Sequence, residues 1–205
     1  MAWQPNYCTT DELRSFVRIG DTADDVQLGL AIAASSRAID RATGRQFGRV
    51  ASAVARVYTA GWDVRRERWY VVLDDVMDAT GMTVEYDSAE DQTYASAITN
   101  YRLGPVNAAA DGRPWTELVV RPASTVQPCD LEDGIQVTAL WGWLAVPAAV
   151  KQACLLQASR VLARRDSPYG VAGSPEAGNE LRLLARVDPD VEVALSPYRR
   201  WWGAV

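Results

Sequence analysis

The spacing of hydrophobic and polar positions changes twice along this chain. Near the N-terminus, apolar residues recur every three to four positions, which predicts helices over about 10–19 and 22–43. Between about 54 and 141, apolar and polar residues alternate in short runs typical of strands. The helical spacing then returns over 147–165. We therefore expect helices on both sides of a central β region.

Local signals mark the ends of these helices. Thr9 and Glu12 have the spacing of a capping box, in which each side chain bonds the other residue's backbone N–H. Gly44 stands where a left-handed residue commonly ends a helix. Pro147 suits a first helical turn, where its missing N–H costs nothing. Pro168 disfavours helical backbone in the residue before it, so the third helix should end near 165.

Six short runs rich in Val, Tyr, Trp and Thr predict strands, separated by Gly, Asp, Asn and Pro. Strands of this length and spacing are typical of a small antiparallel sheet or barrel. The runs are 53–59, 69–73, 83–87, 101–103, 115–120 and 135–141.

The fold class predicted from these elements is α+β. A small helical bundle would comprise 1–53 and 142–186, with an antiparallel β module inserted at 54–141. The segment 166–178 is too rich in Gly and Pro for regular structure, and a short helix is expected near 179–186. Residues 187–205 are predicted to form an extended C-terminal tail that docks on a partner. We expect residues 190–205 to be largely disordered in an isolated subunit.

Composition favours a folded protein with protein partners. Of the 205 residues, 48% are hydrophobic, enough for a substantial core, and the net charge is −5. Residues 1–150 carry 13 basic and 20 acidic side chains, whereas 151–205 carry 8 and 6. An acidic body with a mildly basic end does not suit a protein that grips DNA phosphates. Arginine supplies 20 of the 21 basic residues, which either a GC-rich coding sequence or use of arginine at interfaces would explain.

Several classes of chemistry are excluded by residue type. Histidine is absent, which removes Ser-His-Asp and Cys-His catalysis and most zinc sites. Cys8, Cys129 and Cys154 are odd in number and widely spaced, so neither a disulfide framework nor a metal site is indicated, and Cys154 is expected to be a small core residue. Phosphate-binding and nucleophile-elbow motifs are also missing. We expect no cofactor.

Adjacent carboxylates are the remaining catalytic candidates, but neighbouring side chains diverge on a helix and oppose each other on a strand. They are therefore poor acid–base partners, and we expect solvated turn or cap residues and no enzyme activity. The adjacent carboxylate pairs are Asp24/Asp25, Asp74/Asp75, Glu90/Asp91 and Glu132/Asp133.

The sequence also bears on where the protein is found. The N-terminus lacks the features of a secretory signal, and no apolar run is long enough for a membrane span. A cytosolic protein is therefore expected.

Two segments are candidates for interfaces. In the tail, Tyr198, Arg199, Arg200, Trp201 and Trp202 are of the types that dominate interface hot spots. They would either dock on a partner or pack back on their own subunit. The second candidate comprises Asp166, Ser167, Pro168, Tyr169 and Gly170. Ala149, Leu156 and Ala163 lie off the apolar arc of the third helix and indicate a second contact surface.

These segments carry a family resemblance. A strand ending in WGW, a helix opened by VP, RRDSPYGVAGSPE, a late PYRRWW and an early IDRATGRQF resemble head-to-tail connector (adaptor) proteins of tailed bacteriophages with actinobacterial hosts. The resemblance covers both ends of the chain well and residues 60–130 poorly.

The resemblance implies a structural virion protein with no catalytic residues. Such proteins form a ring, commonly of twelve copies, between the capsid portal and the next stopper or tail component. DNA passes through the ring without specific binding. The expected location is the virion neck, assembled in the host cytoplasm. Two alternatives stay open: another neck component (a stopper or tail terminator), or a Trp-rich β-type module that binds a ligand.

Overall fold

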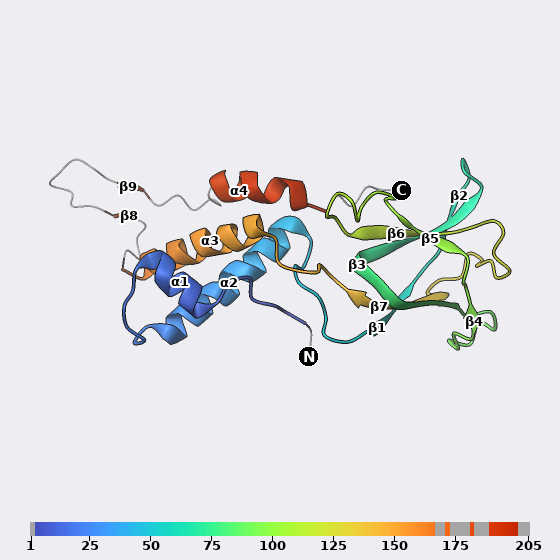
Figure 1. Cartoon of the computed structure of the whole chain (residues 1–205), viewed down its shortest axis with the longest axis horizontal. Coiled ribbons are helices and arrows are strands. Elements are labelled where there is room, and N and C mark those ends of the chain that lie inside the picture. Colours follow the sequence, from blue (N-terminus) through green and yellow to red (C-terminus); the bar gives the residue numbers. More distant parts are fainter. Residues whose placement is uncertain (1–2, 167–170, 173–180, 183–188, 201–205) are drawn as a thin grey trace. The chain divides into compact units, whose positions relative to one another are not determined.

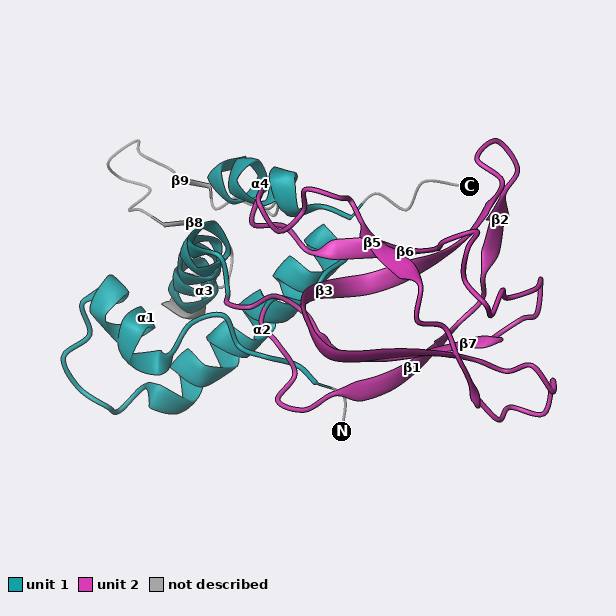
Figure 2. Ribbon diagram, turned by 45° about the vertical axis from the view of Figure 1, so that its right-hand side comes forward, with its two compact units in different colours: residues 1–47, 146–205 teal, residues 48–145 magenta. Residues whose placement is uncertain are grey.

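The computed structural model describes residues 3–166, 171–172, 181–182 and 189–200. The chain forms two compact units, one of residues 1–47 and 146–205 and one of residues 48–145 (Figure 2). The first is helical and the second contains an antiparallel sheet, so the predicted α+β class is confirmed. The sequence placed the boundaries at 53/54 and 141/142, a few residues inside the β unit. That the two units are separate domains, followed by a docking tail, stays a prediction.

The helical unit is organised around α2 (Asp25–Thr43) and α3 (Ala148–Asp166), which pack along one another (Figure 1). We expected these two helices to be in contact, because the β module is predicted to be an insertion into one packed helical bundle. The shorter α1 (Thr10–Val17) packs on both, and α4 (Pro189–Leu195) packs mainly on α3. Buried apolar residues from all four fill the space between them: Leu13, Leu28, Ile32, Ile39, Val150, Ala153, Ala158, Val191 and Leu195.

The predicted capping signals of the first two helices are confirmed. Thr9 Oγ1 accepts from the Glu12 N–H at 3.2 Å, and the Thr9 N–H donates to Glu12 Oε2 at 3.0 Å. Gly44 ends α2 in the left-handed conformation, with φ of 65°. The helix begins three residues later than predicted, because the Asp21 carboxylate accepts the Ala23 N–H in a local turn. Such side-chain-to-backbone bonds compete with helix formation.

Three predictions for the C-terminal region were wrong. Val171–Ala172, within the segment 166–178 expected to lack regular structure, form strand β8. Leu181–Arg182, within the helix expected near 179–186, form strand β9, which pairs with β8. The segment 189–200, within the tail expected to be disordered, forms α4 and a 3₁₀ turn, η2 (Ser196–Tyr198). Pro189 at the start of α4 and acidic residues in its first turn favour this helix. Val191 and Leu195, one turn apart, are each 2% exposed and provide its core contacts.

The β unit is an antiparallel sheet with strand order β1-β7-β3-β6-β5, to which β2 and β4 add as further partners of β3. Four of its strands, β1, β5, β6 and β7, match the predicted runs closely. The short β2 and β4 were not predicted. The bounds are β1 Val54–Tyr58, β2 Gly61–Asp63, β3 Arg68–Tyr86, β4 Ser96–Ala97, β5 Tyr101–Gly104, β6 Trp115–Val120 and β7 Ile135–Trp141.

The predicted runs 69–73 and 83–87 are the two ends of one long strand, β3. Its first part pairs with β6 and its second part with β7, with register shifts on either side of Asp78. Gly81 lies between them with φ of 68°. The turn-like residues 78–81 therefore form an irregular stretch within a strand, because β7 supplies a pairing partner on both sides of them.

Strand β7 carries the core of the β unit. Its alternation predicted Ile135, Val137, Ala139 and Trp141 on the buried face, and all four are buried. The indole N–H of Trp141 donates to the Val54 carbonyl at 2.7 Å, so the polar edge of this large side chain is satisfied. Burial of alternate residues fixes the register, since a slip of one position would expose the whole set.

The chain segments that lead into and out of the β unit pair with each other. The Val50 N–H donates to the Trp141 carbonyl at 3.0 Å, and the Trp143 N–H donates to the Gly48 carbonyl at 2.8 Å. Arg49 and Gly142 form an antiparallel bridge between these bonds. Gly142 has φ of 109°, and a Cβ there would lie 2.0 Å from the Gly48 oxygen. This position therefore requires glycine, both because of its positive φ and because there is no room for a Cβ.

Candidate interface residues and the N-terminal cluster

The predicted interface segment 166–170 is only partly described. Asp166 is the last residue of α3. Ser167, Pro168, Tyr169 and Gly170, like Trp201 and Trp202 of the tail, lie outside the described residues. Whether these residues form interfaces stays a prediction.

Tyr198, Arg199 and Arg200 contact their own helical unit. The Tyr198 ring packs edge-on against Phe47, with centroids 5.7 Å apart. The Arg199 guanidinium pairs with Glu192 on α4 at 3.0 Å, and the Arg200 N–H donates to the Thr43 carbonyl at 2.7 Å. These contacts hold the end of η2 beside the C-terminus of α2.

A buried cluster around Tyr7 was not predicted. Tyr7 is 1% exposed, and its hydroxyl donates to Asp40 and accepts from the Phe47 N–H at 3.1 Å. Its own N–H donates to Ser36 Oγ at 3.2 Å. The segment before α1 is therefore bound to α2 through both the backbone N–H and the side-chain hydroxyl of Tyr7. No spacing in the sequence could reveal this cluster, because its members are about 30 to 40 positions apart.

Burial dominates the ionisation of this cluster. It raises the pKa of Tyr7 because the phenolate would lose its solvation, and the hydrogen bond to Asp40 adds to the effect. Burial also raises the pKa of Asp40, although the hydrogen bond from Tyr7 and the charge of Arg37 oppose the shift. Tyr7 is thus a neutral hydrogen-bond donor at every ordinary pH, and a structural role follows.

Replacing Tyr7 with phenylalanine should lower the free energy of unfolding by about 1–3 kcal/mol, because the Asp40 carboxylate and the Phe47 N–H each lose a buried partner. Chemical denaturation of the purified chain measures the change. Tyr94→Phe is the matched control: Tyr94 is only half-buried, and its hydroxyl donates to the Asp133 carbonyl at 2.9 Å in an exposed bond. Equal losses in the two variants would contradict the role assigned to the Tyr7 cluster.

One expectation about the adjacent carboxylates was wrong. Asp74 and Asp75 lie within β3 and are not solvated turn residues. Asp74 pairs with Arg56 at 2.5 Å and accepts from the Tyr58 hydroxyl at 3.0 Å. Asp75 is 7% exposed and accepts the indole N–H of Trp143 at 2.8 Å. Both carboxylates therefore serve as structural acceptors on opposite faces of the strand.

Among the described residues, the structure contains no group of three or more Cys, Asp or Glu side chains that could hold a metal ion. In the same part of the chain, none of the helices combines the length and the apolar character that crossing a membrane requires.

Helix α2 presents an exposed apolar strip, which we call the α2 stripe: Val26, Leu30, Ala34 and Ala38. These residues are spaced four apart, so they lie on one face. Val26 and Leu30 are 72% and 67% exposed. Apolar side chains of this size in a continuous exposed row indicate a contact surface.

The apolar arc predicted for the third helix comprises Val150, Cys154, Leu155, Ala158, Val161 and Leu162. Of these residues of α3, Val161 is 37% exposed and does not lie in the core. Of the residues expected on a second surface, Ala163 is exposed, whereas Ala149 and Leu156 are half-buried. The last turns of α3 thus expose apolar side chains on more than one side.

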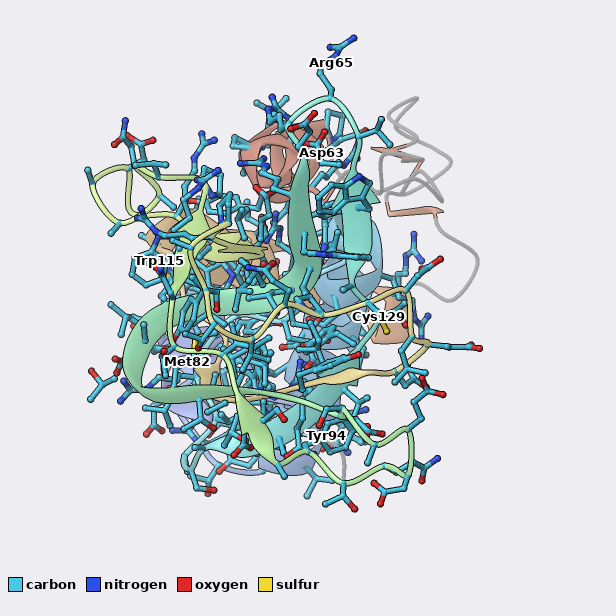
Figure 3. The ribbon with its side chains drawn as sticks, turned by 90° about the vertical axis from the view of Figure 1, so that its right-hand side faces the viewer. Asp63, Arg65, Met82, Tyr94, Trp115 and Cys129 are labelled. Atoms are coloured by element: carbon cyan, nitrogen blue, oxygen red, sulfur yellow. The ribbon has the colours of Figure 1, made fainter. Side chains whose placement is uncertain are left out.

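A second exposed feature is the β2–β3 hairpin of the β unit. Trp62, 46% exposed, packs edge-on against Trp69 across the hairpin, with centroids 5.1 Å apart. Arg65 projects from its tip (Figure 3). Tryptophan and arginine are frequent in protein interfaces.

Comparison with known proteins gives a structural relationship over the whole chain. No protein-family model matches the sequence, and no curated protein does. Among solved structures, the fold is similar to a chain of one described as the neck of an empty GTA particle computed with C6 symmetry. The TM-score is 0.60 at 18% sequence identity, and the match covers 100% of this chain and 96% of the other. The chain therefore has the fold of a phage-like neck component.

Proposed function

We propose that this chain is a head-to-tail connector (adaptor) of a tailed phage or phage-like particle. Several copies would form a ring on the capsid portal, line the DNA conduit and offer an attachment site to the next stopper or tail protein. The chain would be a structural component of the virion neck, with no enzymatic activity. This proposal includes the actinobacterial type of host that the sequence motifs suggest.

The observation that carries this proposal is the extent of the structural similarity. It spans both units and nearly the full length of a neck chain, so it does not rest on a common sheet or helix pair alone. Sequence motifs at both ends of the chain point independently to the same class. The alternative of a Trp-rich ligand-binding module has weaker support, because Trp141 and Trp143 are buried and hydrogen-bonded within the β unit.

A ring places a physical demand on each subunit. Its contacts are heterologous, so every copy needs two different surfaces that meet head to tail. The C6 symmetry of the matched neck is compatible with six copies or a multiple of six, and twelve is the number we propose. The α2 stripe is one candidate surface, and the segments 166–170 and 198–202 are the others.

The decisive experiment combines the purified chain with the portal assembly of the same particle. We expect a ring-sized species in native mass spectrometry, or a ring on the portal in electron micrographs. A chain that stays monomeric and does not bind the portal would overturn the proposal. A chain that binds only after another neck ring is in place would instead identify a stopper or tail terminator.

Replacing Leu30 with glutamate should weaken ring assembly at least tenfold and leave the unfolding midpoint of the monomer nearly unchanged. Leu30 is exposed in the monomer, so the charge costs little until a neighbouring copy removes it from water. Gln27→Glu, on a neighbouring exposed position of α2, is the control for added charge. Native mass or sedimentation at several protein concentrations measures the effect. Normal assembly of the Leu30 variant would exclude the α2 stripe as a ring contact.

A further inference from the structure

Two thiols far apart in the sequence meet inside the helical unit. Cys8, in the segment before α1, and Cys154, on α3, have their sulfur atoms 3.5 Å apart. They are separated by 146 positions, so their spacing in the sequence does not indicate a pair. Both are free thiols, 6% and 0% exposed, whereas Cys129 in the β unit is exposed.

We propose that Cys8 and Cys154 form an oxidation site, at which a small peroxide converts the two thiols into an intramolecular disulfide. The product would join the N-terminal segment covalently to α3. This chemistry requires only the isolated chain and is independent of the proposed function.

The surroundings of the pair favour this reaction. The flanking Tyr7 is held by Ser36 and Asp40, so the backbone beside Cys8 is fixed against α2, which packs along α3. Ser36 Oγ lies 3.5 Å from the Cys154 sulfur. A disulfide needs sulfur atoms about 2.05 Å apart. The sulfur atoms must therefore move about 1.5 Å closer together. Cys8 lies before Thr9, the N-cap of α1, so the backbone of a helix does not restrict its side-chain rotamer.

One thiol of the pair is suited to react first. The hydrogen bond shared with Cys8 lowers the pKa of Cys154 against the opposing effect of burial, and the hydrogen bond with Ser36 acts in the same direction as that with Cys8. The same shared proton raises the pKa of Cys8. Because the thiolate is the reactive species, Cys154 is the expected nucleophile and Cys8 the resolving thiol. The slight exposure of Cys8 gives a molecule as small as hydrogen peroxide a route to the pair.

The oxidation takes place in two steps. The Cys154 thiolate attacks one peroxide oxygen, the O–O bond breaks, and sulfenic acid and hydroxide form. The Cys8 sulfur then attacks the sulfenic sulfur, the S–S bond forms, and the S–OH oxygen leaves as water with the Cys8 proton. In total, two thiols lose two electrons and two protons, and the peroxide becomes two water molecules.

The biological setting would rest on the proposed function. A neck protein is assembled in a reducing cytoplasm and then carried in a particle released from the cell, where disulfides persist. The cross-link would then form after assembly and stabilise the helical unit of the released particle.

The test uses the full-length Cys129→Ser variant, which removes the exposed thiol and with it cross-linking between chains. After treatment with hydrogen peroxide, we expect the intact mass to fall by the mass of two hydrogen atoms. Peptide mapping should find a Cys8–Cys154 cross-link. The unfolding midpoint should rise by roughly 5–15 °C and return on reduction, because the cross-link restricts the unfolded chain.

Cys8→Ser in the same background is the matched control and should show neither the cross-link nor the rise. Two results would overturn the proposal: both thiols remaining open to alkylation after peroxide treatment and unfolding, or oxidation that stops at sulfinic or sulfonic acid. Because the cross-link is read in the Cys129→Ser chain itself, the test does not depend on folding of the Cys8 variant. Failure of ring assembly would leave this result unaffected.

Discussion

Replacing Val191 and Leu195 together with alanine should lower the free energy of unfolding by about 4–6 kcal/mol, which corresponds to a fall in midpoint of roughly 10–20 °C. Both side chains are 2% exposed and are the buried residues of α4. Their truncation removes apolar contacts with α3 and leaves a cavity that a seven-residue helix cannot close. Thermal and chemical denaturation measure the loss.

Val193→Ala is the control for this variant. Val193 lies on the same helix but is 72% exposed, so its truncation should change the midpoint by no more than about 1–2 °C. If the double variant is as stable as the parent, α4 does not belong to the core of the helical unit.

Gly142→Ala should destabilise the β unit by about 3 kcal/mol or more, because a Cβ would lie 2.0 Å from the Gly48 carbonyl oxygen. The atom in the way belongs to the backbone, so no side-chain rotation can relieve the overlap. The hydrogen bond from the Trp143 N–H to that oxygen would be lost as the strands separate. Hydrogen exchange at Val50 and Trp143 should accelerate with the loss of stability.

Gly81→Ala provides a matched control, because Gly81 also has a positive φ but its Cβ would meet nothing within 4 Å. It should cost only about 1–2 kcal/mol, the price of the left-handed conformation alone. Equal costs at the two positions would show that the close approach at Gly142 is not important for stability.

The sequence predicted the fold class because its strongest periodic signals are local. The alternation in β7 and the capping residues of α1 and α2 depend on neighbours a few positions away, and the structure confirms them. The break expected at residues 78–81 was wrong for a related reason. Turn-forming residues were judged by themselves, whereas pairing with β7 keeps the strand continuous.

The C-terminal helix and the N-terminal cluster could not be predicted because they depend on distant partners. Helix α4 has seven residues, too few to be stable alone, and its burial depends on α3. Tyr7, Cys8 and Cys154 gain their roles only when α2 and α3 bring them together. The interface residues predicted at 166–170 and 198–202 remain a prediction, since much of both segments lies outside the described residues.

The paired segments at the base of the β unit also determine how the chain would respond to force. Both connections to the helical unit leave from the same end of an antiparallel ladder, at Gly48 and Trp143. Tension between the two connections would therefore act perpendicular to the strands and break these hydrogen bonds one after another. It would not act along the strands, where all the hydrogen bonds would share the load. The base would yield first, pair by pair, and the hydrophobic core around Trp141 would be the next barrier to mechanical unfolding.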